Sequence, residues 1–433
     1  MQIKKITLTN FRAYEYAEFN FKEGMNLLVG VNGAGKSSVL DVLNVCLSVI
    51  FSNISEAKVK RLSFSNDDIS LGATRLQVSC NFTYLSVNYN LLIEKNKERR
   101  ILTIKPEEEE GLKKKRRTKA KVENIFIDDQ VVFTPQFKLR SKKLSQLGNE
   151  SIAVLFSTKR SLITREIPSK TAIAGGLAAA YSEAFSADRF FNLRIFSDWY
   201  KVQKVLSKEK SKTKKHVSTL DRAIELFLPG FNNLRVHSDR RQTEFYIDKN
   251  NKNFKLRQLS DGERGMIALV FDIARRISQA NPTSSDPLSE GNGIVLIDEL
   301  DLHLHPKWQR TIVENLSNTF PKIQFIATTH SPQIIPSIEP EGIQLIESGA
   351  VVIPDRSLGM DSNWILRNLL DSEDRPVKSL KAIKSVEELI NTGELIKAKL
   401  AIKNFKEKGS LDLAEWATLE ARISKLEILK GEK

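Results

Sequence analysis

The run GVNGAGKSS at residues 30–38 constrains this chain more than any other stretch. It fits the pattern of Gly, four residues and Gly-Lys-[Ser/Thr] that forms a phosphate-binding loop between a strand and a helix. An apolar run of strand length, residues 25–29, precedes it, and apolar residues at helical spacing follow over residues 38–43. The glycines let backbone N–H groups turn toward a polyphosphate, and the N-terminus of the helix adds positive potential. The sequence therefore predicts a nucleoside triphosphate site.

The side chains of this loop predict how a nucleotide and its metal ion would be held. Lys36 is expected to reach the β- and γ-phosphates, and the Ser37 hydroxyl is expected to hold Mg²⁺. The alternative, a chance glycine-rich turn, does not account for the strand before the loop and the helix after it. The predicted nucleotide-contacting residues of the loop are Asn32, Gly33, Gly35, Lys36, Ser37 and Ser38.

The length and composition of the chain are those of a globular protein with two or three lobes. It has 433 residues, of which 41% are hydrophobic and 28% are charged. No apolar run approaches the roughly 20 residues that cross a bilayer, and the start MQIKKI reads as a strand rather than a signal peptide. Cys46 and Cys80 are too few for a metal knuckle or a disulfide framework. We therefore expect a cytoplasmic protein without a membrane partner.

The charge of the chain favours a polyanionic partner. Lys and Arg number 67 against 53 Asp and Glu, a formal net charge of +14, and phosphate backbones bind basic surfaces by counterion release. Part of this charge is clustered, because residues 113–121 hold seven cations in nine positions after an acidic run at 107–110. A basic loop at 105–123 that grips nucleic acid is one interpretation, and a solvated hairpin loop is the other.

Hydrophobic periodicity divides the chain into strand-rich and helix-rich stretches. Alternating apolar and polar residues predict strands within residues 1–30, and a short apolar run predicts another at 151–156. Helical spacing over residues 182–227 predicts a short arm of two or three helices. The predicted organisation is an α/β nucleotide-binding domain split by an insertion, with halves at 1–160 and 234–355, a helical arm at 161–233 and a helical tail at 356–433.

Paired carboxylates follow a second apolar run, residues 293–297. An all-apolar run suits a parallel strand that is covered on both faces, and ligands bind at the carboxyl ends of such strands. Asp298 is expected to hold Mg²⁺, and Glu299 is expected to orient and deprotonate the attacking water. A strand that merely ends in acids is the alternative, which the phosphate-binding loop upstream makes the poorer explanation.

Three histidines are candidates for a chemical role, either at the phosphates or in a metal site. His330 follows another buried strand pattern at residues 323–329 and is expected to reach the γ-phosphate, whereas a hydrogen-bonded structural histidine is the alternative. His303 and His305 suggest a metal site, but no further His or Cys is clustered with them. For this pair we favour exposed polar groups or groups that support the site.

Taken in order, these motifs resemble the nucleotide-binding heads of the ABC class related to structural-maintenance-of-chromosomes (SMC), RecF and Rad50 proteins. The resemblance covers residues 1–60 and 255–350, and LSDGE at 259–263 is similar to the signature motif, although Ser and Gly before a helix are also an ordinary N-cap. No Q-loop glutamine is assigned, since Gln77 is a candidate without a supporting motif. The remaining residues that the resemblance places at the nucleotide are Arg12, Ser260, Gly262, Asp301 and, as the switch histidine, His330.

The resemblance implies a fold, cofactors and an assembly. The fold is an ABC-type P-loop NTPase head, a mixed sheet flanked by helices, with a short inserted helical arm and a helical C-terminal tail. The cofactors are ATP and Mg²⁺, with hydrolysis of ATP to ADP and phosphate. In this class Ser260 and Gly262 of one copy would close over the ATP of the other, which implies a homodimer or higher oligomer with sandwiched nucleotides.

A narrower resemblance is carried by LDLHLHPKWQ at residues 300–309 and TTHSPQ at 328–333. These runs are similar to the Septu-type ATPases of bacterial antiviral operons, including retron-associated versions, and to the ATPase half of overcoming-lysogenisation nucleases. The latter carry a Toprim nuclease after the head. The acids available for one here lack apolar strands before them, so no nuclease centre is predicted in this chain; these acids are Asp355, Asp361, Asp371 and Asp374.

The tail at 361–433 has apolar stripes with a period near 3.6, which either pack on each other or dock a partner protein. The resemblance implies an ATP-driven component of an anti-phage complex of the Septu or retron type, which gates a partner HNH nuclease. A retron reverse transcriptase with its RNA or DNA is a further implied partner. The alternative is an SMC/RecF-like DNA-repair ATPase that acts directly on DNA; a membrane transporter subunit is disfavoured because no coupling segment is identified.

Overall fold

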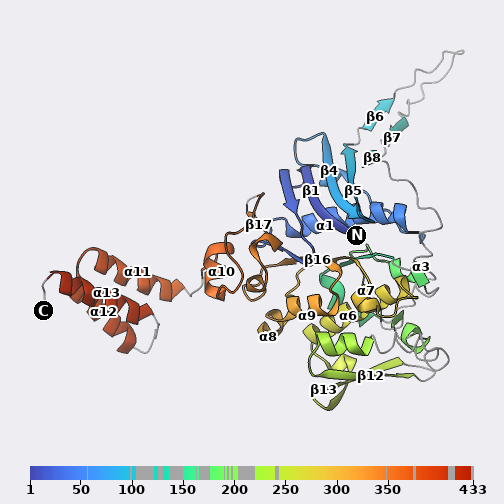
Figure 1. The fold of residues 1–433 in the computed structure, drawn as a ribbon. Coiled ribbons are helices and arrows are strands. Elements are labelled where there is room, and N and C mark those ends of the chain that lie inside the picture. The colour runs from blue at the N-terminus through green and yellow to red at the C-terminus, as the bar shows by residue number, and fades with distance from the viewer. Residues whose placement is uncertain are drawn as a thin grey trace, which may run out of the picture. The chain divides into compact units, whose positions relative to one another are not determined.

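The computed structural model divides the chain into two compact units, Met1–Ile365 and Leu366–Lys433 (Figure 1). The structure describes residues 1–55, 57–97, 100–103, 121–124, 130–135, 150–161, 163–164, 176–189, 191–192, 195–196, 198–202, 220–238, 243–347, 349–373, 377–407 and 415–430.

A mixed six-stranded sheet is the centre of the larger unit. Its order is β18-β17-β3-β16-β15-β9, and every neighbouring pair is parallel except β17 with β18. All residues of β3, β9, β15 and β16 are buried, and these strands are mainly apolar, with Asn26 in β3 and Gln324 in β16 among the buried polar exceptions. The strands are β3 (Met25–Val29), β9 (Ile152–Phe156), β15 (Gly293–Ile297), β16 (Ile323–Thr329), β17 (Ile343–Glu347) and β18 (Ala350–Val352).

An antiparallel sheet of order β2-β1-β4-β5-β8 forms a second layer of this unit. Burial alternates along β4 and β5, as expected where one face packs on the core and the other meets solvent. Its strands are β1 (Gln2–Phe11), β2 (Tyr14–Asn20), β4 (Arg75–Tyr84), β5 (Val87–Asn96) and β8 (Gln130–Thr134). Smaller ladders join β6 (Arg100–Thr103) to β7 (Lys121–Asn124), β10 (Ile163–Thr164) to β11 (Phe191–Asn192), and β12 (Phe231–Ser238) to β13 (Thr243–Lys249) and β14 (Lys252–Lys255).

Helix α1 (Lys36–Ile54) lies between the two sheets (Figure 1). It contacts β9, β15 and β16 on one side. On the other side its buried Cys46 interacts with Cys80 of β4, and this interaction together with burial raises the pKa of the Cys46 thiol. The expectation that no apolar run reaches membrane-spanning length was wrong, because α1 is long and apolar enough to span a bilayer. However, 72% of its apolar stretch is buried inside the protein, as in a core helix.

Helix α6 (Asp261–Ala280) is the other long helix of this unit, and it packs on α3 (Gly176–Tyr181) and on β9. Its capped N-terminus is separated from β14 by a 3₁₀ turn at Leu256–Gln258. The shorter helices of the unit are α7 (Pro287–Glu290), α8 (Pro306–Gln309) and α9 (Ile312–Thr319), with 3₁₀ turns at Asn66–Asp68, Thr158–Ser161, Leu256–Gln258, Ile335–Ser337 and Pro340–Gly342.

The smaller unit is helical and has a core of its own. Helix α10 (Ser362–Leu369) crosses the boundary, and α11 (Val377–Asn391), α12 (Leu395–Glu407) and α13 (Glu415–Lys430) follow. Trp416 is fully buried and stacks on Phe405 with ring centroids 5.7 Å apart. The apolar stripes of the tail therefore pack on each other, while Ile396, Leu400, Ile428 and Leu429 stay exposed.

The predicted α/β head with a mixed sheet flanked by helices and a helical tail is confirmed. Much of the predicted arm at 161–233 lies outside the described residues, although residues 220–227 are helical. Strand β12 begins at Phe231, before the predicted end of the arm. The basic loop at 105–123 also lies outside the described residues, apart from the start of β7.

Candidate nucleotide-binding site

The phosphate-binding loop connects β3 to α1, as the sequence predicts. A Cβ atom on Gly35 would lie 2.5 Å from the Tyr14 hydroxyl oxygen, and the φ angle of Gly35 is 101°. A side chain is therefore excluded at this position by both space and backbone conformation. Tyr14 donates a hydrogen bond to Ala34 O at 3.3 Å, and burial raises the pKa of Tyr14 to about 12, so its hydroxyl keeps the donated proton. Sequence reasoning missed this support under the loop.

Lys36, the first residue of α1, folds its side chain back into the loop. Its ammonium group donates to Gly30 O at 2.8 Å and to Val31 O at 2.9 Å. Burial lowers the pKa of Lys36, while the nearby carboxylates of Asp298, Asp301 and Glu299 raise it. The lysine of the loop thus interacts electrostatically with all three of the predicted acidic residues. The turn residues Asn32 and Gly33 are exposed beside Lys36.

Ser37 and Asp298 meet where the start of α1 faces the carboxyl end of β15. The Ser37 hydroxyl lies 3.0 and 3.2 Å from the two carboxylate oxygens of Asp298. Thr328 of β16 donates to Asp298 at 2.7 Å and accepts the backbone N–H of Glu299 at 2.7 Å. Thr328 was not predicted, but two polar residues at the end of the strand beside β15 were a signal for it.

This oxygen pair fits a magnesium ion. Mg²⁺ is usually bound by one or two protein oxygens together with substrate phosphates and water, rather than by a cage of side chains. The hydroxyl of Ser37 and the carboxylate of Asp298 supply such oxygens beside the phosphate-binding loop. Within the described residues no group of three His, Cys, Asp or Glu side chains gathers elsewhere to hold a metal.

His330 and Asp301 lie at the same edge of the sheet. Asp301 is buried and accepts a hydrogen bond from Thr329 at 2.5 Å. The Nε2 atom of His330 is 3.5 Å from the other carboxylate oxygen of Asp301, and about half of the histidine side chain is exposed. His305 has a different task, since its Nδ1 atom accepts the Lys307 N–H and caps α8.

Arg12 follows β1 and lies against the first turns of α1. It donates to Ser38 Oγ at 3.0 Å, to Asp41 at 2.7 Å and to Asp68 at 2.9 Å. Burial lowers the pKa of Arg12, but the bonds to Asp41 and Asp68 outweigh it, so the net shift is upward. Asp41 and Asp68 were not predicted, because neither belongs to a recognisable motif. The structure brings Arg12 beside the phosphate-binding loop, as the resemblance implies.

Ser260 is the N-cap of α6 and forms a capping box with Glu263, which supports the ordinary N-cap reading of this segment. Gly262 packs against the loop after Asp301, since a Cβ atom there would lie 2.2 Å from His303 O. In the described part of the chain, the hydrogen bonds recorded for Ser260 stay within its own helical turn. Gly262 therefore lies against the loop that follows Asp301, whereas the bonds of Ser260 serve the start of α6 itself.

Comparison with known proteins gives consistent matches. Residues 1–335 match the family model described as AAA ATPase domain. The chain is 30% identical to Retron Ec83 probable ATPase of Escherichia coli, over 87% of this chain and 77% of that protein. It is 28% identical to Retron Vc95 probable ATPase of Vibrio cholerae serotype O1 biovar El Tor, over 79% and 74%, and 24% identical to Septu protein PtuA of Bacillus thuringiensis, over 77% and 72%.

Among solved structures, an SMC head bound to the C-winged helix domain of ScpA aligns with a TM-score of 0.48 and 16% identity, over 83% of this chain and 99% of that one. The assignment rests instead on the sequence matches, which confirm the resemblance to retron-associated and Septu-type ATPases. The chain belongs to the AAA ATPase domain family, in the group that includes Retron Ec83 probable ATPase.

Proposed function

We propose that this chain is the ATP-hydrolysing component of an anti-phage defence complex, and that closure of two heads on ATP gates a partner HNH nuclease. The observation that carries the ATPase part is the bonded set of Ser37, Asp298 and Thr328 beside Lys36. The defence part is supported by the similarity to retron and Septu proteins. A cytoplasmic location fits both.

The residues of the site divide the work of phosphoryl transfer. Magnesium-bound ATP, when present, supplies the γ-phosphoryl group with its charge partly neutralised. Lys36 would bind the phosphates, while Ser37 and Asp298 would hold the metal. Glu299, whose backbone N–H is fixed by Thr328, would orient and deprotonate the attacking water. His330, positioned by Asp301, would face the γ-phosphate.

A second copy of the chain would complete this site. Ser260 and Gly262 lie at the start of α6, a helix N-terminus that suits the γ-phosphate of another subunit. Contact of Gly262 with His303 O keeps this helix start beside the loop that carries Asp301. The proposed dimer therefore presents the signature residues and Asp301 together to the partner's nucleotide.

The substitution Glu299→Gln tests the catalytic assignment. It removes the proposed base with little change of shape, so ATP turnover should fall about 100-fold or more while ATP stays bound. Light scattering in MgATP should then show a dimer that persists longer than that of the wild type. Glu341→Gln is the matched control, because Glu341 is an exposed glutamate in the 3₁₀ turn before β17. Unchanged turnover in Glu299→Gln would reject the assignment of the base.

The smaller unit is the proposed site of partner docking. It keeps Ile396, Leu400, Ile428 and Leu429 exposed after its own core is filled. Apolar side chains on helix surfaces are suitable for helix-in-groove contacts. Mass measurement of the complex purified from its native operon, with and without ATP, tests the assembly. A monomeric mass in both conditions would reject the proposed dimer. Copurification of an HNH protein would support the gating role.

The alternative, a DNA-repair ATPase that acts directly on DNA, is tested by the basic residues. Deletion of residues 105–123 removes the clustered cations. If these residues grip nucleic acid, the deletion should weaken DNA binding and reduce its dependence on salt. Undiminished binding would show that the DNA contact lies elsewhere.

A further inference from the structure

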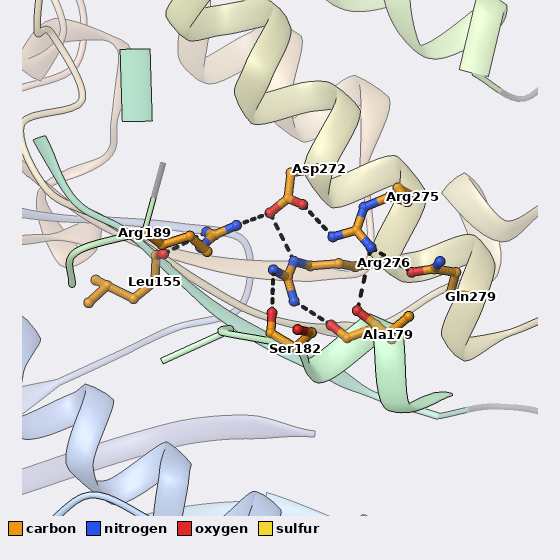
Figure 2. A network of polar contacts seen from close by, with 9 residues as sticks. Leu155, Ala179, Ser182, Arg189, Asp272, Arg275, Arg276 and Gln279 are labelled. Carbon is orange, nitrogen blue, oxygen red and sulfur yellow. Dashed lines mark hydrogen bonds and ion pairs between the residues drawn. The ribbon is translucent and has the colours of Figure 1, made fainter. Parts of the chain in front are cut away.

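Three arginines surround one aspartate in the interior of the larger unit (Figure 2). Asp272 on α6 receives Arg275 at 2.7 Å and Arg276 at 2.8 Å from the same helix. Arg189, from the segment after α3, forms a third ion pair with it. The four side chains are at most 10% exposed.

Burial of such charges is unfavourable unless every one is paired. Burial raises the pKa of Asp272, but the three arginines outweigh this and hold it well below its ordinary value, so the carboxylate stays ionised. Burial lowers the pKa of Arg276 to about 9. The contacts in this cluster therefore depend on one another, because the loss of one charged side chain leaves another buried charge with fewer ion-pair partners.

Two of the arginines have a local task. Arg275 donates to Ala179 O at 3.4 Å and to Gln279 at 2.8 Å. Arg276 donates to Ser182 O at 3.0 Å and to Ala180 O. The three backbone carbonyls lie at the C-terminal end of α3, where such groups lack helical partners. Arg275 and Arg276 thus fasten α6 to α3.

Arg189 reaches in a different direction. It donates to Leu155 O at 2.8 Å, and its guanidinium carbon lies 4.7 Å from the centre of the Phe156 ring. Leu155 and Phe156 are the last residues of β9, the strand beside β15. The carbonyl of Phe156 in turn accepts the backbone N–H of Asp298 at 2.8 Å. A continuous set of contacts therefore runs from α6 through Arg189 to the backbone of Asp298.

We propose that Arg189 is a positioning residue that couples the helix beginning after Ser260 to the strand end that holds Asp298 and Glu299. Any shift of α6 moves Asp272, and Arg189 passes that shift to β9 because its two bonds join these elements directly. Hydrolysis then depends on where the signature end of α6 lies. The inference rests on the ATP hydrolysis of the proposed function, and it holds for any partner.

The test compares Arg189→Met with Arg275→Met. Each substitution removes one ion pair to Asp272 and keeps an apolar stem of similar length. Arg189 also donates to Leu155 O of β9, whereas the other bonds of Arg275 go to Ala179 and Gln279. We expect Arg189→Met to lower kcat about tenfold with the KM for ATP changed by less than about twofold. Arg275→Met should lower the melting temperature comparably and leave kcat within about twofold. Arg189→Lys, which keeps the charge but not the fork of donors, should recover part of kcat.

A second readout does not need turnover. Hydrogen exchange of the Asp298 amide, which is bonded to Phe156 O, should speed up in Arg189→Met and not in Arg275→Met. An equal effect of the two substitutions on kcat and on exchange would overturn the proposal and leave the cluster purely structural. If Arg189→Met does not fold, Arg189→Lys is compared with Arg275→Lys in the same two measurements. Absent ATPase activity in the folded wild type would reject the proposed function, whereas the exchange result still decides the coupling.

Discussion

Arg12 donates two hydrogen bonds to Asp68, one from its side chain and one from its backbone. The Arg12 side chain donates to the Asp68 carboxylate at 2.9 Å, and the Arg12 backbone N–H donates to the Asp68 carbonyl at 2.8 Å. The second bond fixes Arg12 in a left-handed backbone conformation, with φ at 50°. The side chain is thereby set beside Ser38 at the start of α1 before any nucleotide arrives.

Asp68→Ala should therefore weaken ATP binding more than catalysis. Removal of the carboxylate takes away one of the bonds that orient the Arg12 guanidinium and leaves those to Asp41 and Ser38. We therefore expect the KM for ATP to rise about three- to fivefold with little change in kcat. Steady-state kinetics measures both. Asp67→Ala is the matched control, since Asp67 is the exposed neighbour in the same 3₁₀ turn. An equal rise of KM in both variants would contradict the assigned role.

Gly35→Ala should destabilise the protein through a clash as well as through backbone strain. The added Cβ would press on the Tyr14 ring, with contacts of 2.5 to 3.1 Å. Gly33→Ala is the control, because Gly33 also has a positive φ angle but open space around it. We expect Gly33→Ala to lower the free energy of unfolding by about 1–2 kcal/mol, and Gly35→Ala by about 1–3 kcal/mol more.

Urea denaturation gives these free energies. The double variant with Tyr14→Phe should recover part of the loss in Gly35→Ala, since the closest contact is with the hydroxyl oxygen. Equal losses of unfolding free energy for Gly33→Ala and Gly35→Ala would contradict this prediction. They would show that the clash with Tyr14 adds nothing to the cost of the backbone strain.

Asp272→Asn should change how stability depends on pH. The pKa of Asp272 is depressed in the folded protein from its ordinary 3.8, so its ionisation stabilises the fold above that value. This contribution is lost as the pH falls from 3.8 through the folded pKa. The free energy of unfolding of the variant should be lower at neutral pH by about 3–5 kcal/mol. On acidification the variant should not show the further decrease that protonation of Asp272 causes in the wild type.

Urea unfolding at a series of pH values measures the effect. Asp261→Asn is the control, because Asp261 is a largely exposed partner of Arg264 on the same helix. An acid limb of the stability curve that is the same in Asp272→Asn and the wild type would contradict this assignment.

Trp416→Ala should unfold the smaller unit and leave the ATPase head intact. Trp416 is fully buried among the apolar residues of α11, α12 and α13, so its truncation should cost about 3–5 kcal/mol. Hydrogen exchange should become fast over residues 377–430 and stay slow in β15 and β16. Leu429→Ala, at a 72% exposed position, should change stability by less than about 0.5 kcal/mol. Global unfolding in Trp416→Ala would show that the two units are not independent.

The parts of the site that local sequence patterns specify were predictable. Lys36 and Ser37 are fixed by spacing within one loop, and Asp298 by the end of an apolar strand. Thr328, Asp41 and Asp68 act through neighbours from other segments of the chain; Arg12 and Asp68, for example, are 56 positions apart. No periodicity or spacing carries that information, because it arises only when the two sheets pack around α1.

The same limit applies to features that composition describes correctly but incompletely. Cys46 and Cys80 are too few for a disulfide framework, yet the fold places the two thiols in contact between α1 and β4. Likewise, the apolar helix α1 passes a membrane test by length and composition, although the protein itself surrounds it. In both cases tertiary packing decides the outcome, by bringing the thiols together in the first and by burying the helix in the second.

The missing side chain at Gly262 has a mechanical consequence. Because the His303 carbonyl fills the space that a methyl group would need, the start of α6 and the turn after Asp301 are in close backbone contact. In the proposed dimer, a twin subunit that met one of these segments would therefore meet the other beside it.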